Sequence, residues 1–439
     1  MIAARDALQR RLQGLLNAPV STTSRAVIGR GAISALPELI HDLELPDRAL
    51  VVADPNTYTA AGRAVAELLG QAAEVLVVEP DTVSDAHAAT VWGALDRLGP
   101  MVPLAVGAGT VNDIVKLAAE WAGRPYVSVA TAPSMNGYPS PIAAVLRHGL
   151  KCTIPAAPPV AIVYDTTVVA AAPQAMIGSG YADLLAKPCS QADWIVAREL
   201  AGDPFPQEPL RIIDGVVEAV VDAGPGIATA DPEAVELLCL GLTLSGLSMA
   251  AAGSSQPASG SEHLISHFWD MIGHRDGWEP DLHGRQVGLG CLIVSAVFER
   301  LLRLDPADLV PGAQPSDAVS LAADMRGVYG SLADAALSEF AAKSPDARAI
   351  GQRLAQARSR WLRLRDELQA CAVSAATMRE HLLRGGAPTT LAEVGRTPDE
   401  ALTALTWARA MRGRYTCLDL ASEIGALDQW AEDIIAEVS

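Results

Sequence analysis

The pattern of apolar residues changes near residue 170, and this change restricts the folds that the chain can adopt. Before it, short β-branched runs alternate with helical segments, which is typical of parallel β-α-β units. The expected strands are Ala49–Ala53, Glu74–Val78, Leu104–Val106 and Tyr126–Ala130, with a further strand pair near Cys152–Thr153 and Ala161–Tyr164. The expected helices between them include Thr59–Leu69 and Ala86–Leu98.

From about Pro173 onward, long amphipathic helical stretches replace the alternating pattern. We expect helices at Glu233–Ala251, Glu262–Met271, Gly288–Leu304, Asp317–Ala342, Ala347–Cys371 and Pro398–Met411. A chain of 439 residues is too long for one ordinary core, so two domains are expected. The predicted fold is an α/β domain of the nucleotide-binding type at residues 1–172, followed by an all-helical domain at residues 173–439.

Charge and cysteine usage indicate the cellular setting. A net charge of −18 argues against nucleic-acid binding, which depends on Lys and Arg neutralising phosphates. The six cysteines are widely spaced and form no Cys-x-x-Cys motif, which favours reduced thiols in a cytoplasmic protein. The charged amphipathic N-terminus does not resemble a signal peptide, and no apolar run is long enough to predict membrane insertion.

A glycine-containing turn follows the strand at Leu104–Val106 and opens a helix. It reads Gly107-Ala108-Gly109-Thr110-Val111. Glycines let the backbone approach a ligand closely, and a helix N-terminus offers N–H groups and a positive dipole end to a diphosphate. The third glycine of the Rossmann motif is missing, so an ordinary tight turn is an equal alternative.

Two other segments follow predicted strands and favour a ligand site at the same edge of the sheet. Asp54 ends a strand, where its carboxylate could accept hydrogen bonds from a ribose, although a simple Asp-Pro-Asn turn is the alternative. The segment Ala130–Ser140 is rich in polar and turn-forming residues at a strand's carboxyl end. Such sheets bind ligands at that edge, and the alternative is a long structural loop.

Four of the eight histidines fall between His263 and His283. His263 and His267 are four residues apart and share a helix face, and imidazole is a common ligand for zinc and iron. His263 and His283 are the leading candidate ligands, whereas His274 is better explained as an exposed or core residue.

A carboxylate would complete a catalytic metal site of three protein ligands, and Asp183 is the best candidate. Its apolar neighbours Ala182, Leu184 and Leu185 make it costly to bury without a partner. A helical ion pair with Lys187, four residues on, is the alternative that spacing alone favours.

These motifs together resemble the iron-containing alcohol dehydrogenase and glycerol dehydrogenase superfamily, and most closely its sn-glycerol-1-phosphate dehydrogenases. Four passages carry the resemblance, in the order typical of that family. They are Gly107–Asp113, Thr131–Tyr138, Pro257–Met271 and Arg414–Leu420.

The resemblance implies a dehydroquinate synthase-like fold, with NAD or NADP on the first domain and one divalent metal on the second. Zinc is favoured as the metal, with iron or nickel as alternatives. The implied metal ligands are Asp183, His263 and His283, and His267 corresponds to a substrate-contacting histidine. The residues implied to bind the dinucleotide are Gly107, Ala108, Gly109, Thr110 and Val111 for the diphosphate, Thr131, Ser134 and Ser140 for the nicotinamide half, and Asp54 for the adenosine ribose.

The sequence departs from the family pattern at three positions. Asn136 replaces a substrate-binding aspartate, Gln256 an arginine and Gln286 a lysine. Each change exchanges a charge for an amide, and neutral hydrogen bonds hold a phosphate less strongly than charge-assisted ones. The departures therefore bear on the substrate rather than on the scaffold.

The resemblance predicts reversible hydride transfer between a nicotinamide cofactor and the pair sn-glycerol 1-phosphate and dihydroxyacetone phosphate, or a closely related polyol. Three alternatives stay open: a dehydrogenase of an unphosphorylated polyol or ketone, a dehydroquinate synthase-like cyclase, and a catalytically impaired nucleotide-binding homologue. The expected partners are a small-molecule substrate and further copies of the chain, in a dimer or larger homo-oligomer.

Overall fold

The chain divides into two compact units in the computed structural model, which describes residues 2–80, 82–147, 150–312, 318–341, 343 and 346–439. The sheet unit comprises Met1–Leu184, Gln207–Ser255 and Arg384–Gly386. The helical unit comprises Leu185–Pro206, Gln256–Leu383 and Ala387–Ser439. This division differs from the expected one at residue 172, because residues 173–184 and a helical segment from 207 to 255 belong to the sheet unit.

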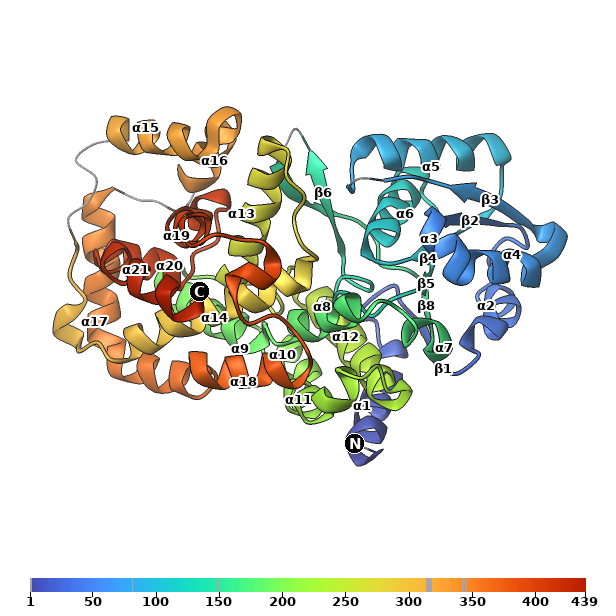
Figure 1. The fold of residues 1–439 in the computed structure, drawn as a ribbon, viewed down its shortest axis with the longest axis horizontal. Coiled ribbons are helices and arrows are strands. Elements are labelled where there is room, and N and C mark those ends of the chain that lie inside the picture. Colours follow the sequence, from blue (N-terminus) through green and yellow to red (C-terminus); the bar gives the residue numbers. More distant parts are fainter. Residues whose placement is uncertain (1, 81, 148–149, 313–317, 342, 344–345) are drawn as a thin grey trace. The chain divides into compact units, whose positions relative to one another are not determined.

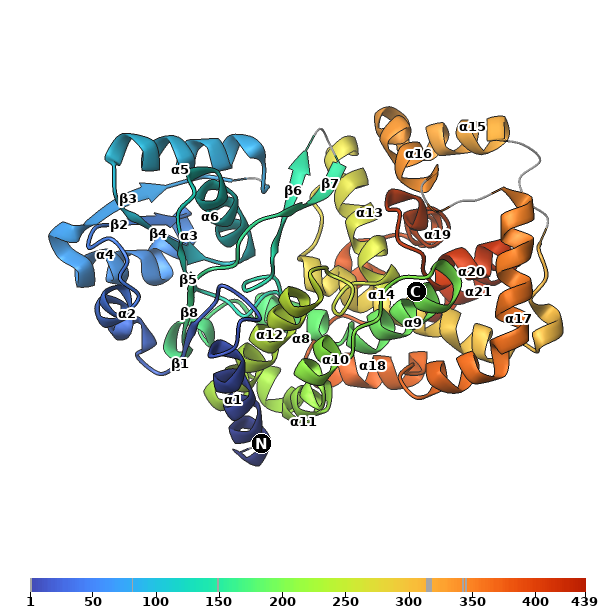
Figure 2. The same ribbon diagram turned by 180° about the vertical axis from the view of Figure 1, so that it is seen from behind.

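A six-stranded parallel sheet forms the centre of the sheet unit (Figures 1 and 2). Its strands are β1 (Arg25–Gly29), β2 (Ala49–Ala53), β3 (Ala73–Val77), β4 (Val102–Gly107), β5 (Val127–Ala130) and β8 (Ala161–Asp165). Their order is β1-β8-β5-β4-β2-β3, and every neighbouring pair is parallel. The four strands predicted between residues 49 and 130 are confirmed, and β1 was not predicted.

The sheet unit also contains helices. They are α1 (Ile2–Leu16), η1 (Ala32–Ala35), α2 (Leu36–Asp42), α3 (Pro55–Thr57), η2 (Tyr58–Gly62), α4 (Arg63–Leu69), η3 (Gly70–Ala72), α5 (Asp85–Leu98), α6 (Gly109–Ala122), α7 (Thr166–Val169), α8 (Gln174–Leu184), α10 (Glu208–Ile213), α11 (Val216–Ile227) and α12 (Pro232–Ala252). Of these, α5 and α6 pack on one face of the sheet and α2 and α4 on the other.

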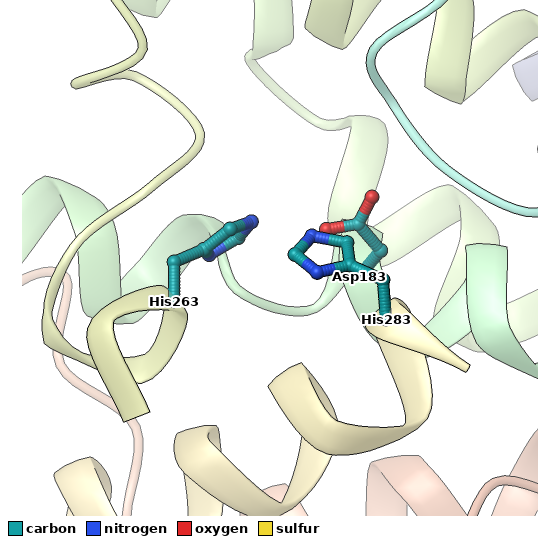
Figure 3. A group of neighbouring side chains, drawn as sticks. All are labelled: Asp183, His263 and His283. Carbon is teal, nitrogen blue, oxygen red and sulfur yellow. The ribbon is translucent and has the colours of Figure 1, made fainter. Parts of the chain in front are cut away.

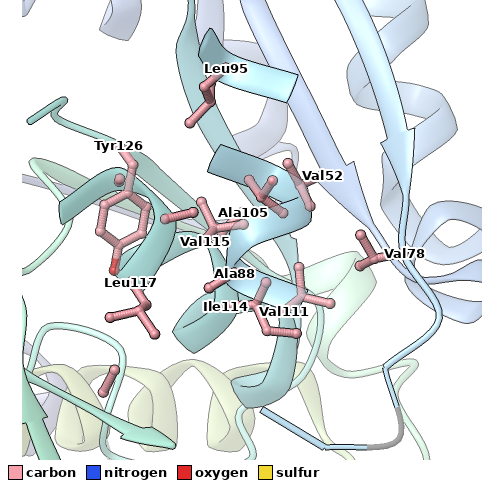
Figure 4. Close-up of a cluster of buried hydrophobic side chains, with 14 of the residues drawn as sticks. Val52, Val78, Ala88, Leu95, Ala105, Val111, Ile114, Val115, Leu117 and Tyr126 are labelled. Atoms are coloured by element: carbon pink, nitrogen blue, oxygen red, sulfur yellow. The ribbon is translucent and has the colours of Figure 1, made fainter. Parts of the chain in front are cut away.

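Alternate residues of β2 belong to opposite cores, as the two-residue period of a strand requires. Leu50 and Val52 pack in a cluster with residues of α5 and α6, drawn in Figure 4. Val51 packs in a second cluster, with residues of α2 and α4. Burial on both faces explains why the strands read as unbroken apolar runs in the sequence.

The predicted strand pair near Cys152 and Ala161 is wrong in its pairing. Strand β7 (Leu150–Pro155) instead pairs antiparallel with β6 (Ile142–Arg147), in a separate two-stranded sheet. Strand β8 lies in the main sheet, between β1 and β5. The two strands are close in sequence, and nothing local in their composition shows which partner each would take.

Within the described residues, the regular secondary-structure elements of the helical unit are helices. They are α9 (Lys187–Ala201), α13 (Ser261–Asp276), α14 (His283–Leu302), η4 (Pro306–Asp308), α15 (Ala318–Tyr329), η5 (Gly330–Leu332), α16 (Ala333–Ala341), α17 (Ala347–Gln369), α18 (Ala375–Arg384), η6 (Leu391–Val394), α19 (Pro398–Trp407), η7 (Ala408–Met411), α20 (Cys417–Glu423) and α21 (Leu427–Val438). The predicted fold class, an α/β part followed by a helical part, is confirmed.

Three predicted helices differ from the observed ones in their details, and one of them, expected at Pro398–Met411, becomes the 3-10 turn η7 after Trp407. The helix expected at Asp317–Ala342 is broken at Gly330, whose positive φ of 54° ends α15, and its two end residues lie outside the described ones. The helix expected at Thr59–Leu69 begins as the π-helical turn η2 before α4.

Helix α12 is long and apolar enough, by length and composition, to cross a membrane. It is the one such helix among the described residues. Of its most apolar stretch, 83% is buried inside the protein, as is usual for a core helix.

Candidate metal and cofactor site

The predicted glycine turn joins β4 to α6, with Ala108 as the residue before the helix. A Cβ atom on Gly107 would lie 2.5 Å from Cβ of Val111, so this position admits only glycine without a rearrangement. A Cβ atom on Gly109 would lie 2.8 Å from Sδ of Met135, which is a flexible side chain. The turn therefore brings bare backbone to the N-terminus of a 14-residue helix, the arrangement that binds diphosphates.

The segment Thr131–Ser140 follows β5 at the same edge of the sheet as the glycine turn. Its predicted site residues Thr131, Ser134 and Ser140 are all buried, and the backbone N–H of Thr131 donates to the carbonyl of Gly107 over 3.2 Å. The two segments that the sequence predicted to share a ligand site are thus brought together.

Helix α8 fixes the other side of this segment. A Cβ atom on Gly180 would lie 1.7 Å from the carbonyl oxygen of Pro133, so only glycine lets the two backbones approach this closely. One turn further along the same helix face, Oδ2 of Asp183 accepts a hydrogen bond of 2.8 Å from the backbone N–H of Asn136. The position of Asn136 is therefore tied to that of Asp183.

Lys116, on α6, was missed by sequence reasoning although it organises the same segment. Its side chain is completely buried, and Nζ donates to the carbonyls of Gly137 (2.9 Å), Ser140 (3.1 Å) and Ile142 (2.8 Å). Burial lowers the pKa of Lys116, and Asp113, 3.6 Å away, opposes this effect. The signal available in the sequence was a lone cation on the apolar face of a helix.

Asp54 lies at the end of β2, as predicted, but its side chain has a structural task. Its Oδ1 accepts hydrogen bonds from the backbone N–H groups of Asn56 and Thr57, both at 2.9 Å, and caps α3. This is the turn that the sequence offered as the alternative, and a contact of Asp54 with a ribose stays a prediction.

Asp183, His263 and His283 form the one cluster with metal-ligand spacing found among the described residues. Asp183 comes from the end of α8, and His263 and His283 come from the first turns of α13 and α14. One ligand atom of each residue lies within 4.8 Å of those of the other two, and the side chains point toward one another (Figure 3). Asp183 and His263 are buried, and His283 is partly buried.

His267 lies beside this cluster. Its ring is stacked on that of His283 with a centroid distance of 5.3 Å, and it lies 6.0 Å from the ring of His263. His267 is thus adjacent to two of the three candidate ligands, and its role as a substrate contact stays a prediction. His274 is exposed in the last turn of α13, in line with its exclusion from the ligand set.

Both candidate histidine ligands are oriented by a neighbour at Nδ1. Oε1 of the fully buried Glu262 lies 2.8 Å from Nδ1 of His263, and Oγ of Ser266 lies 3.3 Å from Nδ1 of His283. A carboxylate at Nδ1 favours the tautomer in which Nε2 carries the lone pair, which is how metal-binding histidines are commonly held. One carboxylate and two oriented imidazoles suit zinc or iron.

The three departures from the family pattern have defined surroundings. Nε2 of Gln256 donates to Oδ2 of Asp203, and Nε2 of Gln286 donates to Oδ1 of Asp270, both over 2.7 Å. The side-chain Nδ2 of Asn136 is buried and has no hydrogen-bond partner within the described part of the chain.

Comparison with known proteins identifies relatives of this chain. A sequence profile described as iron-containing alcohol dehydrogenase matches residues 27–173. Glycerol-1-phosphate dehydrogenase (NAD(P)+) of Halalkalibacterium halodurans is 35% identical over 286 residues, which cover 63% of this chain and 71% of the relative. The enzyme of the same name from Bacillus licheniformis is 30% identical, with 92% of this chain and 90% of the relative covered.

A solved structure extends the likeness to the whole fold. Maleylacetate reductase from Agrobacterium tumefaciens matches with a TM-score of 0.60 and 19% sequence identity, covering 94% of this chain and 97% of that chain. At this identity the match concerns the fold alone. The sequence identity to the two curated relatives shows that this chain belongs to the glycerol-1-phosphate dehydrogenase family of iron-containing alcohol dehydrogenases.

Proposed function

We propose that the chain is an NAD(P)- and metal-dependent dehydrogenase that interconverts sn-glycerol 1-phosphate and dihydroxyacetone phosphate. The name shared by its relatives supports this substrate pair. The observation that carries the proposal is the grouping of Asp183, His263 and His283 within 4.8 Å of one another. A structural role does not explain why two imidazoles and a buried carboxylate converge on one point.

These three residues would hold the metal, each through the atom facing the other two. When bound, a divalent cation supplies Lewis-acid polarisation of a carbonyl oxygen, and a nicotinamide supplies the hydride. Glu262 would keep the proton of His263 on Nδ1 and leave Nε2 to the metal. His267, stacked against His283, would orient the substrate or relay a proton.

The sheet unit would bind the cofactor. The backbone from Gly107 to Val111 would receive the diphosphate, because the N–H groups and dipole of α6 favour an anion there. Thr110 would add a hydroxyl, and Thr131, Ser134 and Ser140 would surround the nicotinamide half. Burying the partnerless Nδ2 of Asn136 is costly unless a ligand satisfies it, so we assign it to a substrate oxygen.

A spectrophotometric assay tests this proposal. The purified chain is mixed with dihydroxyacetone phosphate and either NADH or NADPH, before and after removal of metal with a chelator. We expect oxidation of at least one cofactor, its loss on chelation, and its recovery with zinc, iron or nickel. Turnover that is unchanged after complete metal removal would contradict the metal role, and a lack of turnover in every metal-loaded form would contradict the substrate.

An unphosphorylated ketone is a second candidate substrate. Gln256 and Gln286 both donate to carboxylates, so these two positions supply amides rather than cations for binding a phosphate. Comparison of kcat/KM for dihydroxyacetone and dihydroxyacetone phosphate separates the two candidates. A higher value for dihydroxyacetone favours the second.

A cytoplasmic location and a homo-oligomeric state, dimer or larger, complete the proposal. The six free cysteines support a reducing compartment. Light scattering of the purified chain measures the oligomeric state, and a monomer at micromolar concentration would contradict it.

A further inference from the structure

Asp193, on α9, is a fully buried acid with no part in the mechanism above. Its carboxylate is only 2% exposed, yet it contacts the N-termini of two other helices of the helical unit. Oδ2 accepts hydrogen bonds from the backbone N–H and the hydroxyl of Ser261, at 2.6 and 2.5 Å. Oδ1 accepts one from the backbone N–H of Cys417, at 2.7 Å.

Both contacts fall on the first residue of a helix. Ser261 begins α13, and its preceding residue, Gly260, has no side chain to cap the helix. Cys417 begins α20 within the Arg414–Leu420 segment, which the sequence singled out and which has no role so far. One carboxylate thus takes the place of the missing cap of α13 and also caps α20, where negative charge is favoured by both helix dipoles.

The contact with α13 lies two residues from His263. A Cβ atom on Gly260 would lie 2.5 Å from Oδ2 of Asp193 and 2.8 Å from Oε2 of Glu262, so the two carboxylates enclose this glycine. The backbone N–H of Gly260 donates to Oε1 of Glu262 over 2.7 Å, and the same oxygen holds Nδ1 of His263. A shift of the α13 terminus would therefore move the group that orients His263.

The Arg414–Leu420 segment contributes a compensating cation. Arg414 is partly buried, and its guanidinium donates to the carbonyl of Ser259 and attracts both Glu262 and Asp193. Burial lowers the pKa of Arg414 to about 10, which still leaves it charged at neutral pH. The segment thus contacts the residues that immediately precede α13.

We propose that Asp193 is a positioning residue of the metal centre, which fixes the start of α13, and with it His263, by capping α13 and α20 together. This inference rests on the proposed metal role of His263. Asp193 itself would bind neither metal nor substrate.

The test compares Asp193→Asn with Asp165→Asn. Asp165 is a matched control because it is also buried and accepts hydrogen bonds from Gly31, Ile33 and Thr167, but in the sheet unit. Zinc affinity is measured by competition with a chromophoric chelator, and folding by circular dichroism. We expect Asp193→Asn to weaken zinc binding about 10-fold, the lower end for residues that support metal ligands, and Asp165→Asn to change it less than about twofold.

A second readout needs no metal. In metal-free protein labelled with ¹⁵N-histidine, the imidazole signals of His263 should shift in Asp193→Asn and not in Asp165→Asn. If zinc binds but both variants leave its affinity and these signals unchanged, the positioning role is overturned. If the wild type binds no zinc while the His263 signals shift only in Asp193→Asn, the positioning stands and the proposed metal role fails.

Ser261→Ala covers the case in which Asp193→Asn does not fold. It removes one donor to Asp193 and keeps the backbone N–H, so we expect a two- to threefold loss of zinc affinity in the same direction. A folded Ser261→Ala variant with wild-type zinc affinity and wild-type His263 signals would count against the proposal.

Discussion

Two buried charges of opposite sign hold segments together that are distant in sequence, Lys116 in the sheet unit and Asp193 in the helical unit. Lys116 in the sheet unit donates to three carbonyl oxygens of the segment that follows β5. Asp193 in the helical unit accepts from the N-termini of two helices. The difference follows from the backbone groups available, since a loop presents unpaired carbonyls and a helix N-terminus presents unpaired N–H groups.

The largest loss of stability is expected when Lys116 is replaced. We expect Lys116→Met to lower the free energy of unfolding by about 4 kcal/mol, because three carbonyls and Asp113 lose a cationic partner. NADH affinity, measured by fluorescence titration, should fall with it. Lys343→Met is the counterpart, since Lys343 donates to the carbonyl of Arg414 and to Asp419 in the helical unit. It should destabilise the chain and leave NADH affinity intact, and equal effects of both variants on NADH would refute the distinction.

Glycine substitutions test whether the same segment is seated rigidly on α8. Gly180→Ala should cost about 3 kcal/mol, since the added methyl group meets the carbonyl of Pro133 and only a backbone shift relieves it. Gly93→Ala, in the exposed middle of α5 with open space around its Cβ position, should instead stabilise by about 0.5–1 kcal/mol. Urea unfolding measures both. A neutral Gly180→Ala variant would show that the loop is not fixed against α8.

Restoring a cation tests the substrate assignment. Gln286→Lys should lower the KM for dihydroxyacetone phosphate about 10-fold if a phosphate binds near this position, because a charged donor replaces an amide. Dihydroxyacetone is the control, and its KM should not fall. Unchanged KM values for both ketones would place the phosphate away from Gln286.

The smallest effect is a difference in pH dependence between two buried aspartates of the metal-free protein. Burial alone would raise the pKa of Asp165, but hydrogen bonds from Thr167, Ile33 and Gly31 outweigh it and hold the pKa below its ordinary value. Burial, and then the neighbouring Glu262, raise the pKa of Asp193 to about 6.

The two shifts affect stability in opposite directions. The stabilisation from Asp165 is present above its ordinary pKa of about 4 and is lost as the pH falls through its lower folded value. The contribution of Asp193 is present below about pH 4 and is lost as the pH rises through its folded pKa. Relative to the wild type, Asp165→Asn should therefore gain stability below about pH 4, and Asp193→Asn between about pH 4 and pH 6. Urea midpoints across this range measure both, and parallel curves would contradict the assignment.

Local patterns in the sequence predicted the parts of the molecule that local forces determine. The strands of the main sheet from β2 to β5, the glycine turn and most helices follow from apolar periodicity and turn residues. The pairing of β7 with β6 did not, because both possible partners lie nearby in sequence. The assignment of Asp183 to the metal cluster depended on the family resemblance, because its spacing to Lys187 favoured an ion pair.

Long-range contacts account for what was missed. Lys116 and Asp193 are single charged residues within helices, and their partners lie 21 or more residues away. The apolar neighbours of Lys116 mark it as a buried cation, but no local pattern shows which distant backbone groups such a residue contacts. Asp54 differs, because its contacts are local and its sequence fits a helix cap and a ribose contact equally well.

The metal role of His263 is tested most directly by comparing the metal content and activity of His263→Ala with those of His274→Ala. His274 lies on the same helix and is exposed, so its variant controls for the loss of an imidazole. The wild type and His274→Ala should bind one zinc or iron per chain and oxidise NAD(P)H with dihydroxyacetone phosphate. His263→Ala should lose both properties while keeping its fold. A folded His263→Ala variant that retains the metal and turns over at the wild-type rate would contradict the assignment of His263 to a catalytic metal centre.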